Sequence, residues 1–146
     1  TSADEMYIAV MELASQSDIF ISTAAVSDYR PKFSSQNKIK KISSKDITIE
    51  LKQNIDILSS VTEKFSSLYV VGFAAETEDL ENNAKKKLIA KNLNLIIAND
   101  VSNKEIGFDS DDNEVTLISA NKQLIISKTQ KSKVARSILE FIAEEV

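Results

Sequence analysis

LYVVGFAAE, residues 68–76, and LNLIIAND, residues 93–100, are two short apolar runs on either side of a charged segment. Apolar runs of this length are typical of strands that are buried on both faces of a sheet. Between them, Thr77 can cap a helix whose first turn is acidic and whose later turns carry lysines, an order that complements the helix dipole. A strand, a helix and a second strand in this order predict a parallel α/β sheet.

The chain before this unit begins with a predicted helix and a third buried strand. Ser2 and Glu5 form a capping-box pattern, and apolar residues follow at helical spacing. Residues 18–25 are apolar almost throughout, which again favours a buried strand.

A flap and a further helix connect that strand to the central unit. Residues 26–46 contain the single proline and several serines, so we predict a loop or flexible flap. Residues 47–51 alternate like a strand with one wet face. Asn54 or Asp56 can cap the next helix. The apolar positions of that helix are Ile57, Leu58, Val61 and Phe65.

The last part of the chain predicts a hairpin and a closing helix. GFDSDDN, residues 107–113, is a predicted turn, and residues 114–118 and 123–127 form a predicted β-hairpin. A helix starts at about Thr129, with Val134, Ile138, Leu139 and Ile142 facing inward. The predicted fold class is therefore α/β. We expect a Rossmann-like, three-layer parallel sheet flanked by helices, with a flexible flap and a C-terminal hairpin, in a single domain of residues 1–146.

Composition limits the chemistry that this chain can perform. It has 146 residues and a net charge of −4, which argues against a general nucleic-acid binder. It has no apolar run long enough for a membrane span and no signal-peptide pattern, so the cytoplasm is the expected location. Without His or Cys it cannot form a Ser-His-Asp triad, a thiolate nucleophile or most zinc sites. With only two glycines it lacks an intact dinucleotide-binding or P-loop motif.

Polar groups gather where the buried strands end. Asp28 follows the first strand, Glu76 ends the second and Asp100 ends the third. Ligands bind at the carboxyl ends of parallel strands, so these positions mark the expected site. Lysines 38, 40 and 41 lie in the flap, and Lys87 and Lys91 share a helix face. Two lysine clusters and a strand-end acid suit a nucleoside triphosphate with Mg²⁺.

Each of these signals also has an ordinary structural interpretation. Lysines four residues apart on a helix are commonly just solvated, and KIKK, residues 38–41, can be a basic surface strand. Asp28 can be a turn former, and Phe73 can belong to the core. GFDSDDN lacks the twelfth-position Glu of an EF-hand. The residues alone therefore predict an α/β domain suited to a nucleotide, with its phosphate loop elsewhere.

The order of the motifs resembles phosphopantothenoylcysteine synthetase. AAVSDYRP, NKIKK, NIDIL, VGFAAET, AKKKLIAKNLNLIIANDV and GFDSDDN follow one another as in that family, from about Met6 to the last helix. The enzyme is often the C-terminal part of a bifunctional coenzyme A biosynthesis protein. The resemblance implies a Mg²⁺- and CTP-dependent ligase. It activates the carboxylate of 4′-phosphopantothenate as an acyl-cytidylate, and the cysteine amine then displaces CMP.

The resemblance also implies roles for particular residues. Asp28 would contact the CTP ribose or its metal and take part in catalysis, and Lys38 would reach the phosphates from the flap and support the acyl-cytidylate chemistry. The strand end and the start of the following helix would hold the nucleoside. The remaining CTP-binding residues that it implies are Ser22, Thr23, Ala24, Ile55, Asp56, Ile57, Leu58, Phe73, Lys87 and Lys91.

Several departures from the family pattern affect these expectations. Ile55 stands where proline is usual, which frees the local φ angle and restores an N–H for the base-reading segment. Asn94 stands where Asp is usual. The family's N-terminal strand and Gly-rich turn are not in this sequence, so we expect that part of the fold to be absent and CTP binding to be weak.

The resemblance also implies partners and leaves two alternatives open. It implies a homodimer and a flavin-dependent phosphopantothenoylcysteine decarboxylase fused or bound to the chain, and neither a nucleic acid nor a membrane as partner. One alternative is a non-catalytic dimerisation module that pairs through the flap and hairpin. The other is a fragment of a Rossmann-type NADP-dependent reductase, against which the missing GxGxxG counts.

Overall fold

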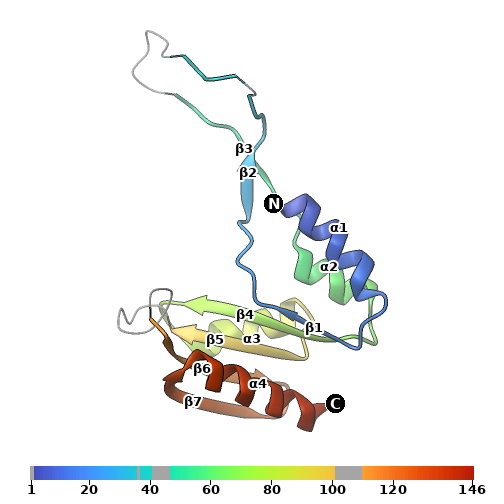
Figure 1. The fold of residues 1–146 in the computed structure, drawn as a ribbon, viewed down its shortest axis with the longest axis vertical. Helices are drawn as coiled ribbons and strands as arrows, with labels where there is room; N and C mark the ends of the chain where they lie inside the picture. The colour runs from blue at the N-terminus through green and yellow to red at the C-terminus, as the bar shows by residue number, and fades with distance from the viewer. Residues whose placement is uncertain (1, 36, 41–46, 101–109) are drawn as a thin grey trace.

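The computed structural model describes residues 2–35, 37–40, 47–100 and 110–146. Within these ranges a five-stranded sheet has the strand order β1-β4-β5-β6-β7, and a short two-stranded ladder pairs β2 with β3 (Figure 1). The helices are α1 (Ala3–Ala14), α2 (Ile57–Lys64), α3 (Leu80–Ala90) and α4 (Lys131–Glu145). The strands are β1 (Ile19–Ser22), β2 (Tyr29–Pro31), β3 (Leu51–Gln53), β4 (Tyr69–Glu76), β5 (Leu95–Asp100), β6 (Asp112–Ser119) and β7 (Gln123–Gln130).

The predicted strand–helix–strand unit is confirmed as β4, α3 and β5. These two strands run parallel, and β1 pairs parallel with β4 on the other side. The predicted hairpin is also confirmed, since Ser119 and Lys122 close the turn between β6 and β7. The hairpin joins the same sheet, because β6 pairs antiparallel with β5. The sheet is therefore mixed, with a parallel half and an antiparallel half.

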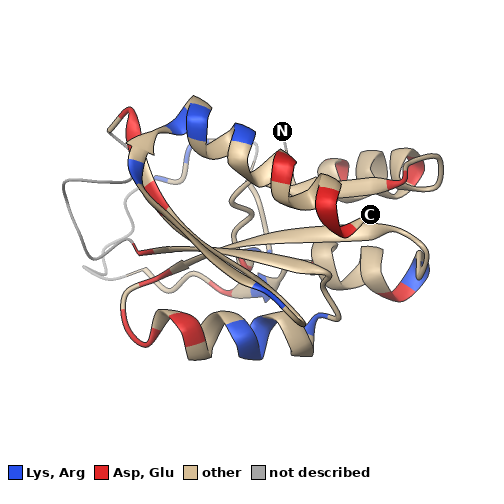
Figure 2. Ribbon diagram, turned by 90° about the horizontal axis from the view of Figure 1, so that it is seen from below, with Lys and Arg blue, Asp and Glu red and all other residues tan. Residues whose placement is uncertain are grey.

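The sheet has one apolar core on each face. Val70, Ile96 and Ala98 face a core that includes residues of α2 and α3, with α1 packed against it. Val71, Ile97 and Leu117 face the other core, which α4 covers. Figure 2 shows α3 and α4 on opposite sides of the sheet, and it shows the acidic start and basic later turns of α3. No helix among the described residues has both the length and the hydrophobicity needed to cross a bilayer.

Three sequence expectations about these elements are wrong. The strand predicted over residues 18–25 is only β1, and it is partly exposed because it is an edge strand of the described sheet with one neighbour. Thr77 is not the cap of α3, which starts after Asp79 in a left-handed conformation with φ of 46°. Leu139 is not inward but 57% exposed, whereas Phe141 is buried.

The predicted flap contains structure of its own. Tyr29–Pro31 pairs antiparallel with Leu51–Gln53, so the second strand of the region comes later than the predicted strand over residues 47–51. We call residues 29–53 the arm, and its described part projects from the body of the molecule (Figure 1). Residue 36 and residues 41–46, which include Lys41 of the KIKK stretch, lie outside the described residues, as does the start of the predicted turn at 107–109.

Candidate functional site

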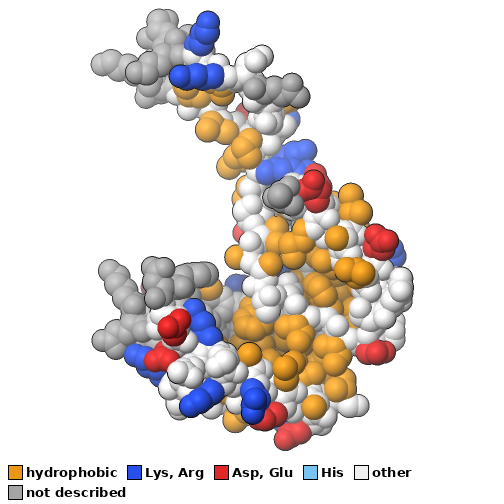
Figure 3. All heavy atoms as spheres, in the orientation of Figure 1, with side chains coloured by type: hydrophobic (Ala, Val, Ile, Leu, Met, Phe, Trp, Pro, Cys, Tyr) orange, Lys and Arg blue, Asp and Glu red, His pale blue; other side chains and the backbone are white. Residues whose placement is uncertain are grey.

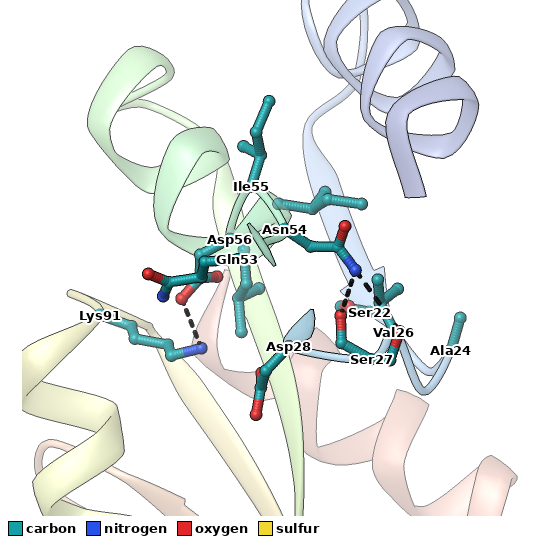
Figure 4. A pocket seen from close by; sticks show the side chains of 12 residues that line it. Ser22, Ala24, Val26, Ser27, Asp28, Gln53, Asn54, Ile55, Asp56 and Lys91 are labelled. Atoms are coloured by element: carbon teal, nitrogen blue, oxygen red, sulfur yellow. Dashed lines mark hydrogen bonds and ion pairs between the residues drawn. The ribbon is translucent and has the colours of Figure 1, made fainter. Parts of the chain in front are cut away.

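A pocket of about 160 Å³ lies where the chain leaves β1 and where β3 passes into α2. This is the carboxyl end of β1, where α/β sheets bind ligands. Side chains from four separate parts of the chain converge on it, as Figure 4 shows. Its lining residues are Ser22, Ala24, Val26, Ser27, Asp28, Gln53, Asn54, Ile55, Asp56, Ile57, Leu58 and Lys91.

Asp56 joins the two helices beside the pocket. It is the N-cap of α2, and its Oδ1 accepts a hydrogen bond of 3.1 Å from the Ser59 N–H. Its Oδ2 lies 2.9 Å from Nζ of Lys91, at the C-terminal end of α3. Burial by itself raises the pKa of Asp56, but the hydrogen bonds from Lys91 and Ser59 outweigh it and the net pKa is lowered. The carboxylate therefore stays charged and holds a lysine at the edge of the pocket.

Asn54 holds the loop that forms the opposite wall. Its backbone N–H donates to the Asp28 carbonyl at 2.7 Å, and its Nδ2 donates to the Ser27 carbonyl at 2.7 Å. The side chain is buried, and its Oδ1 accepts from Nη1 of Arg30 at 2.8 Å. Every polar group of this side chain is thus engaged, which fixes the loop of residues 27–28 against the start of α2.

The Asp28 carboxylate is available to a ligand. Within the described part of the chain, no side chain pairs with it, and Figure 4 shows it turned away from the Asn54–Ser27 contact. One carboxylate with room beside it fits Mg²⁺, which proteins commonly bind through one or two carboxylates and the phosphates of a substrate. The described residues hold no cluster of three acidic side chains that could form a metal cage.

Glu76 and Lys87 form a second acid–lysine pair at the same end of the sheet. Glu76 ends β4, and its Oε1 lies 2.6 Å from Nζ of Lys87 on α3. The side chain of Glu76 is only 12% exposed, whereas that of Lys87 is 48% exposed. Each of the two predicted phosphate-binding lysines of α3 is therefore held by a carboxylate, Lys87 by Glu76 and Lys91 by Asp56.

A family model described as "DNA/pantothenate metabolism flavoprotein C-terminal domain" matches residues 1–146. The chain belongs to this family. Among curated relatives, the coenzyme A biosynthesis bifunctional protein CoaBC of Vibrio parahaemolyticus is 46% identical over 148 residues. The match covers 99% of this chain and 37% of that protein. CoaBC of Bacillus subtilis is 49% identical over 116 residues, covering 80% of this chain and 28% of that protein. The chain thus spans about a third of the length of such relatives.

Several solved structures share the fold. The C-terminal domain of a CoaBC superposes with a TM-score of 0.76 at 36% identity, covering 97% of this chain and 61% of that one. The DNA/pantothenate metabolism flavoprotein of Streptococcus pneumoniae gives 0.79 at 29% identity, covering 100% and 71%. A Cab2 complex with phosphopantothenate-cysteine gives 0.66 at 17% identity, covering 99% of this chain and 53% of that one, and supports the fold alone.

The structure gathers most of the family-implied site residues into the pocket. They come from the β1 end, the following loop, the start of α2 and the end of α3. The residues brought together are Ser22, Ala24, Asp28, Ile55, Asp56, Ile57, Leu58 and Lys91.

Four of the expected site residues do not line the pocket. Thr23 is exposed just after β1, and Lys87 is paired with Glu76. Phe73 is 39% exposed. It lies two residues after Val71 in β4, so both side chains are on the sheet face that α4 covers. Lys38 lies in the arm beyond the β2–β3 ladder.

Sequence reasoning did not find four lining residues, Val26, Ser27, Gln53 and Asn54. The sequence did contain a signal for Asn54. Asn54 and Asp56 are both good capping residues, and one helix needs only one cap. An extra polar residue there can serve another segment, and in the structure it serves the 27–28 loop. The other three carry no pattern that distinguishes them from loop or strand residues.

Proposed function

We propose that this chain supplies the CTP site of a phosphopantothenate–cysteine ligase in coenzyme A biosynthesis. The observation that carries the proposal is the pocket at the β1 end, which combines the free carboxylate of Asp28 with the ammonium group of Lys91. The curated relatives, which are named coenzyme A biosynthesis bifunctional proteins, support it.

The reaction balances without a protein nucleophile. The carboxylate of 4′-phosphopantothenate attacks the α-phosphorus of CTP, forming the acyl-cytidylate and releasing pyrophosphate. The cysteine amine then attacks the acyl carbon, forms the amide bond, loses a proton and expels CMP. Cations must stabilise the charge that builds up on the phosphates, which suits a site where Lys87, Lys91 and the arm lysine Lys38 can meet. This chemistry agrees with a chain that has neither His nor Cys.

We propose the following placement of CTP in the pocket. Small side chains at Ser22 and Ala24 let the nucleoside approach the end of β1. The backbone of residues 55–58, at the start of α2, offers donors and acceptors to the cytosine edge. Lys91 and Lys87 then exchange their carboxylate partners for phosphate oxygens. Thr23 and Phe73 keep the nucleotide-binding roles that the resemblance implies, as proposals.

Asp28 would hold Mg²⁺ or the ribose. The metal, when bound, neutralises phosphate charge and aligns the pyrophosphate as a leaving group. Asp28 is kept in place for either ligand by its own carbonyl, which the Asn54 N–H holds at 2.7 Å.

The arm carries Lys38 and an exposed apolar surface. The arm carries Lys38 away from the pocket of its own body, and it exposes apolar side chains, visible in orange in Figure 3. These are Phe33, Ile39, Ile47, Ile49 and Leu51. Such a surface favours association, so we propose a homodimer in which the arms pair and Lys38 of one copy serves the site of the other.

The wider setting follows from the same relatives. They are bifunctional proteins, so we propose that this chain acts fused to, or beside, a flavin-dependent phosphopantothenoylcysteine decarboxylase in the cytoplasm.

The test is a nucleotide assay on the complete protein. With CTP, Mg²⁺, 4′-phosphopantothenate and cysteine, we expect equimolar CMP, pyrophosphate and amide product, with ATP a poor substitute. Lys38→Gln should lower the rate about 10²-fold, as expected for loss of one charge-stabilising donor.

Lys40→Gln, on the same arm, is the matched control and should change the rate less than about twofold, as for an ordinary surface charge. The absence of CMP from the wild-type reaction, or equal losses in the two variants, would contradict the proposal.

A further inference from the structure

The base of the arm is held to the body by one polar cluster around the buried Asn54, which we call the root cluster: Asp4, Ser27, Arg30 and Asn54. Arg30 lies in β2, and its Nη1 donates to Oδ1 of Asp4 at 2.6 Å and to Oδ1 of Asn54 at 2.8 Å. Asp4 belongs to the first turn of α1, and Asn54 follows β3 directly. One guanidinium thus connects the arm to two parts of the body.

The same cluster also sets one wall of the pocket. Asn54 donates to the Ser27 carbonyl through Nδ2 and to the Asp28 carbonyl through its backbone N–H, both at 2.7 Å. Arg30 fixes the orientation of the Asn54 amide, because only its Oδ1 can accept from a guanidinium. A change at Arg30 therefore reaches the Asp28 loop through Asn54.

Few other contacts fix the direction of the arm. β2 and β3 pack chiefly against each other, and the next cross-arm contact, between Lys32 and Glu50, lies within the arm itself. Tyr29, at the base of the ladder, and Leu51, at its far end, are both more than half exposed. The side chain of Arg30, by contrast, is 30% exposed.

We infer that Arg30 and Asn54 are positioning residues that align the arm with the nucleotide pocket. Arg30 sets the direction in which the arm leaves the body, and Asn54 passes that position to the loop carrying Asp28. In the proposed homodimer, Arg30 thereby sets where Lys38 arrives in the site of the other copy, and Asn54 sets the position of Asp28 within its own copy. The catalytic consequence rests on the proposed function, but the structural consequence does not.

The first experiment measures the arm directly. The chain contains no cysteine, so Glu12→Cys on α1 and Lys40→Cys on the arm give one pair of spin-label sites, both exposed. The labelled chain is diluted with unlabelled chain to suppress distances between copies. We expect a narrow distance distribution in the parent, a clearly broader or shifted one with Arg30→Met, and a partly restored one with Arg30→Lys.

Lys32→Met is the matched control for this measurement. It removes an arm ion pair of 3.1 Å that does not reach the body, so the distribution should stay as in the parent. Distributions that are identical in the parent and in Arg30→Met would overturn the proposal, and so would equal broadening by Lys32→Met.

The second experiment separates positioning from folding in the complete protein. With Arg30→Met we expect kcat for CMP release to fall about 10-fold or more, since small misplacements of reacting groups are costly, while KM for CTP changes little. With Asn54→Asp, which keeps an acceptor for Arg30 but loses the donor to Ser27, KM for CTP should rise. A lower melting temperature with unchanged kcat per folded molecule in both variants would show a merely structural role.

The two experiments fail in different ways. If the wild-type protein releases no CMP, the proposed function is lost and the distance measurement alone decides the role of Arg30. If CMP is released normally and Arg30→Met matches Arg30→Lys in kcat, the positioning role is wrong while the ligase proposal stands.

Discussion

At the level of single residues, Asp56 has two roles, as the cap of α2 and as the partner of Lys91 in an ion pair. A substitution by Asn tests the two roles separately. Asn also caps helices well, so Asp56→Asn should keep α2 while removing the charge opposite Lys91. The Asp56 side chain is 44% exposed, so the ion pair is worth at most about 1 kcal/mol. Its larger effect should be on CTP binding, because Lys91 loses its fixed position.

The lowered pKa of Asp56 gives this pair a pH signature. A carboxylate whose pKa is lowered in the folded state stabilises the fold at pH values above its ordinary pKa of 3.8. That stabilisation is lost as the pH falls through the folded-state pKa. We therefore expect the melting temperature of the wild type, relative to Asp56→Asn, to decline as the pH is lowered below about 4. A difference in melting temperature that stays constant between pH 6 and pH 3 would contradict the ion pair.

Tyr69 presents the opposite case, a buried polar atom without a partner. Within the described residues its hydroxyl has no hydrogen-bond partner, and burial, with the nearby charge of Glu145, raises its pKa to about 12. Tyr69→Phe removes the unsatisfied group and should stabilise the fold by about 1 kcal/mol. Chemical denaturation measures the change, with Tyr29→Phe, at an exposed position, as the neutral control.

The Tyr69 pKa can be followed separately by absorbance. Because the folded-state pKa is raised, ionisation of Tyr69 leaves the free energy of unfolding unchanged below pH 10 and lowers it as the pH rises from 10 to about 12. We expect one of the three tyrosines to ionise only near that upper value. Ionisation of Tyr69 near pH 10 in the folded chain would contradict its burial.

At the element scale, β4 depends on a glycine. A Cβ built at Gly72 would lie 2.9 Å from Cδ2 of Leu58 and 2.9 Å from Cδ1 of Leu93. These leucines reach the strand from α2 and from the segment before β5, so the glycine lets both pack onto the sheet. Its small size, and not an unusual φ angle, is what the position requires.

Gly72→Ala should therefore cost about 1–3 kcal/mol of stability through overpacking. Because Leu58 also lines the pocket, the same substitution should weaken CTP binding. Chemical denaturation and nucleotide titration measure the two effects. In the Leu58→Ala background the stability cost should be smaller, because the space for the methyl group is already open. Equal costs in both backgrounds would mean that Leu58 is not the neighbour that is displaced.

At the scale of the whole molecule, the arm is the part that the two cores do not support. Its apolar side chains are exposed in a single copy, and pairing of two copies would bury them. We expect the chain to sediment as a dimer and Phe33→Lys to yield monomers. Ile89→Lys, at a position 79% exposed on α3, is the control and should remain dimeric.

The exchange of Lys38 between copies has its own test in the complete protein. Lys38→Gln and Asp28→Asn should each be nearly inactive alone. Mixed and allowed to exchange subunits, they should regain about a quarter of the wild-type activity, since half the dimers are mixed and each has one intact site. No recovery, in a mixture shown to have exchanged, would place Lys38 in the site of its own copy.

Sequence patterns predicted most of the helices and strands, and many of the residues that line the pocket. Periodicity and apolar runs placed β4, α3, β5 and the hairpin, because burial on a sheet face leaves a local pattern. The strand-end rule and the family resemblance together named most of the pocket-lining residues, from Ser22 to Lys91. These features depend on neighbours in the chain or on motif order, which a sequence displays directly.

Which distant groups meet became clear from the three-dimensional structure alone. It paired Asp56 with Lys91 and Glu76 with Lys87, and it moved the arm's second strand to Leu51–Gln53. It also showed that Asn54, which the sequence offered as one of two possible caps, instead connects Arg30 to the loop of residues 27–28. Side-chain partners that lie 11 to 35 residues apart in the chain depend on how elements pack in three dimensions, and no local pattern records that geometry.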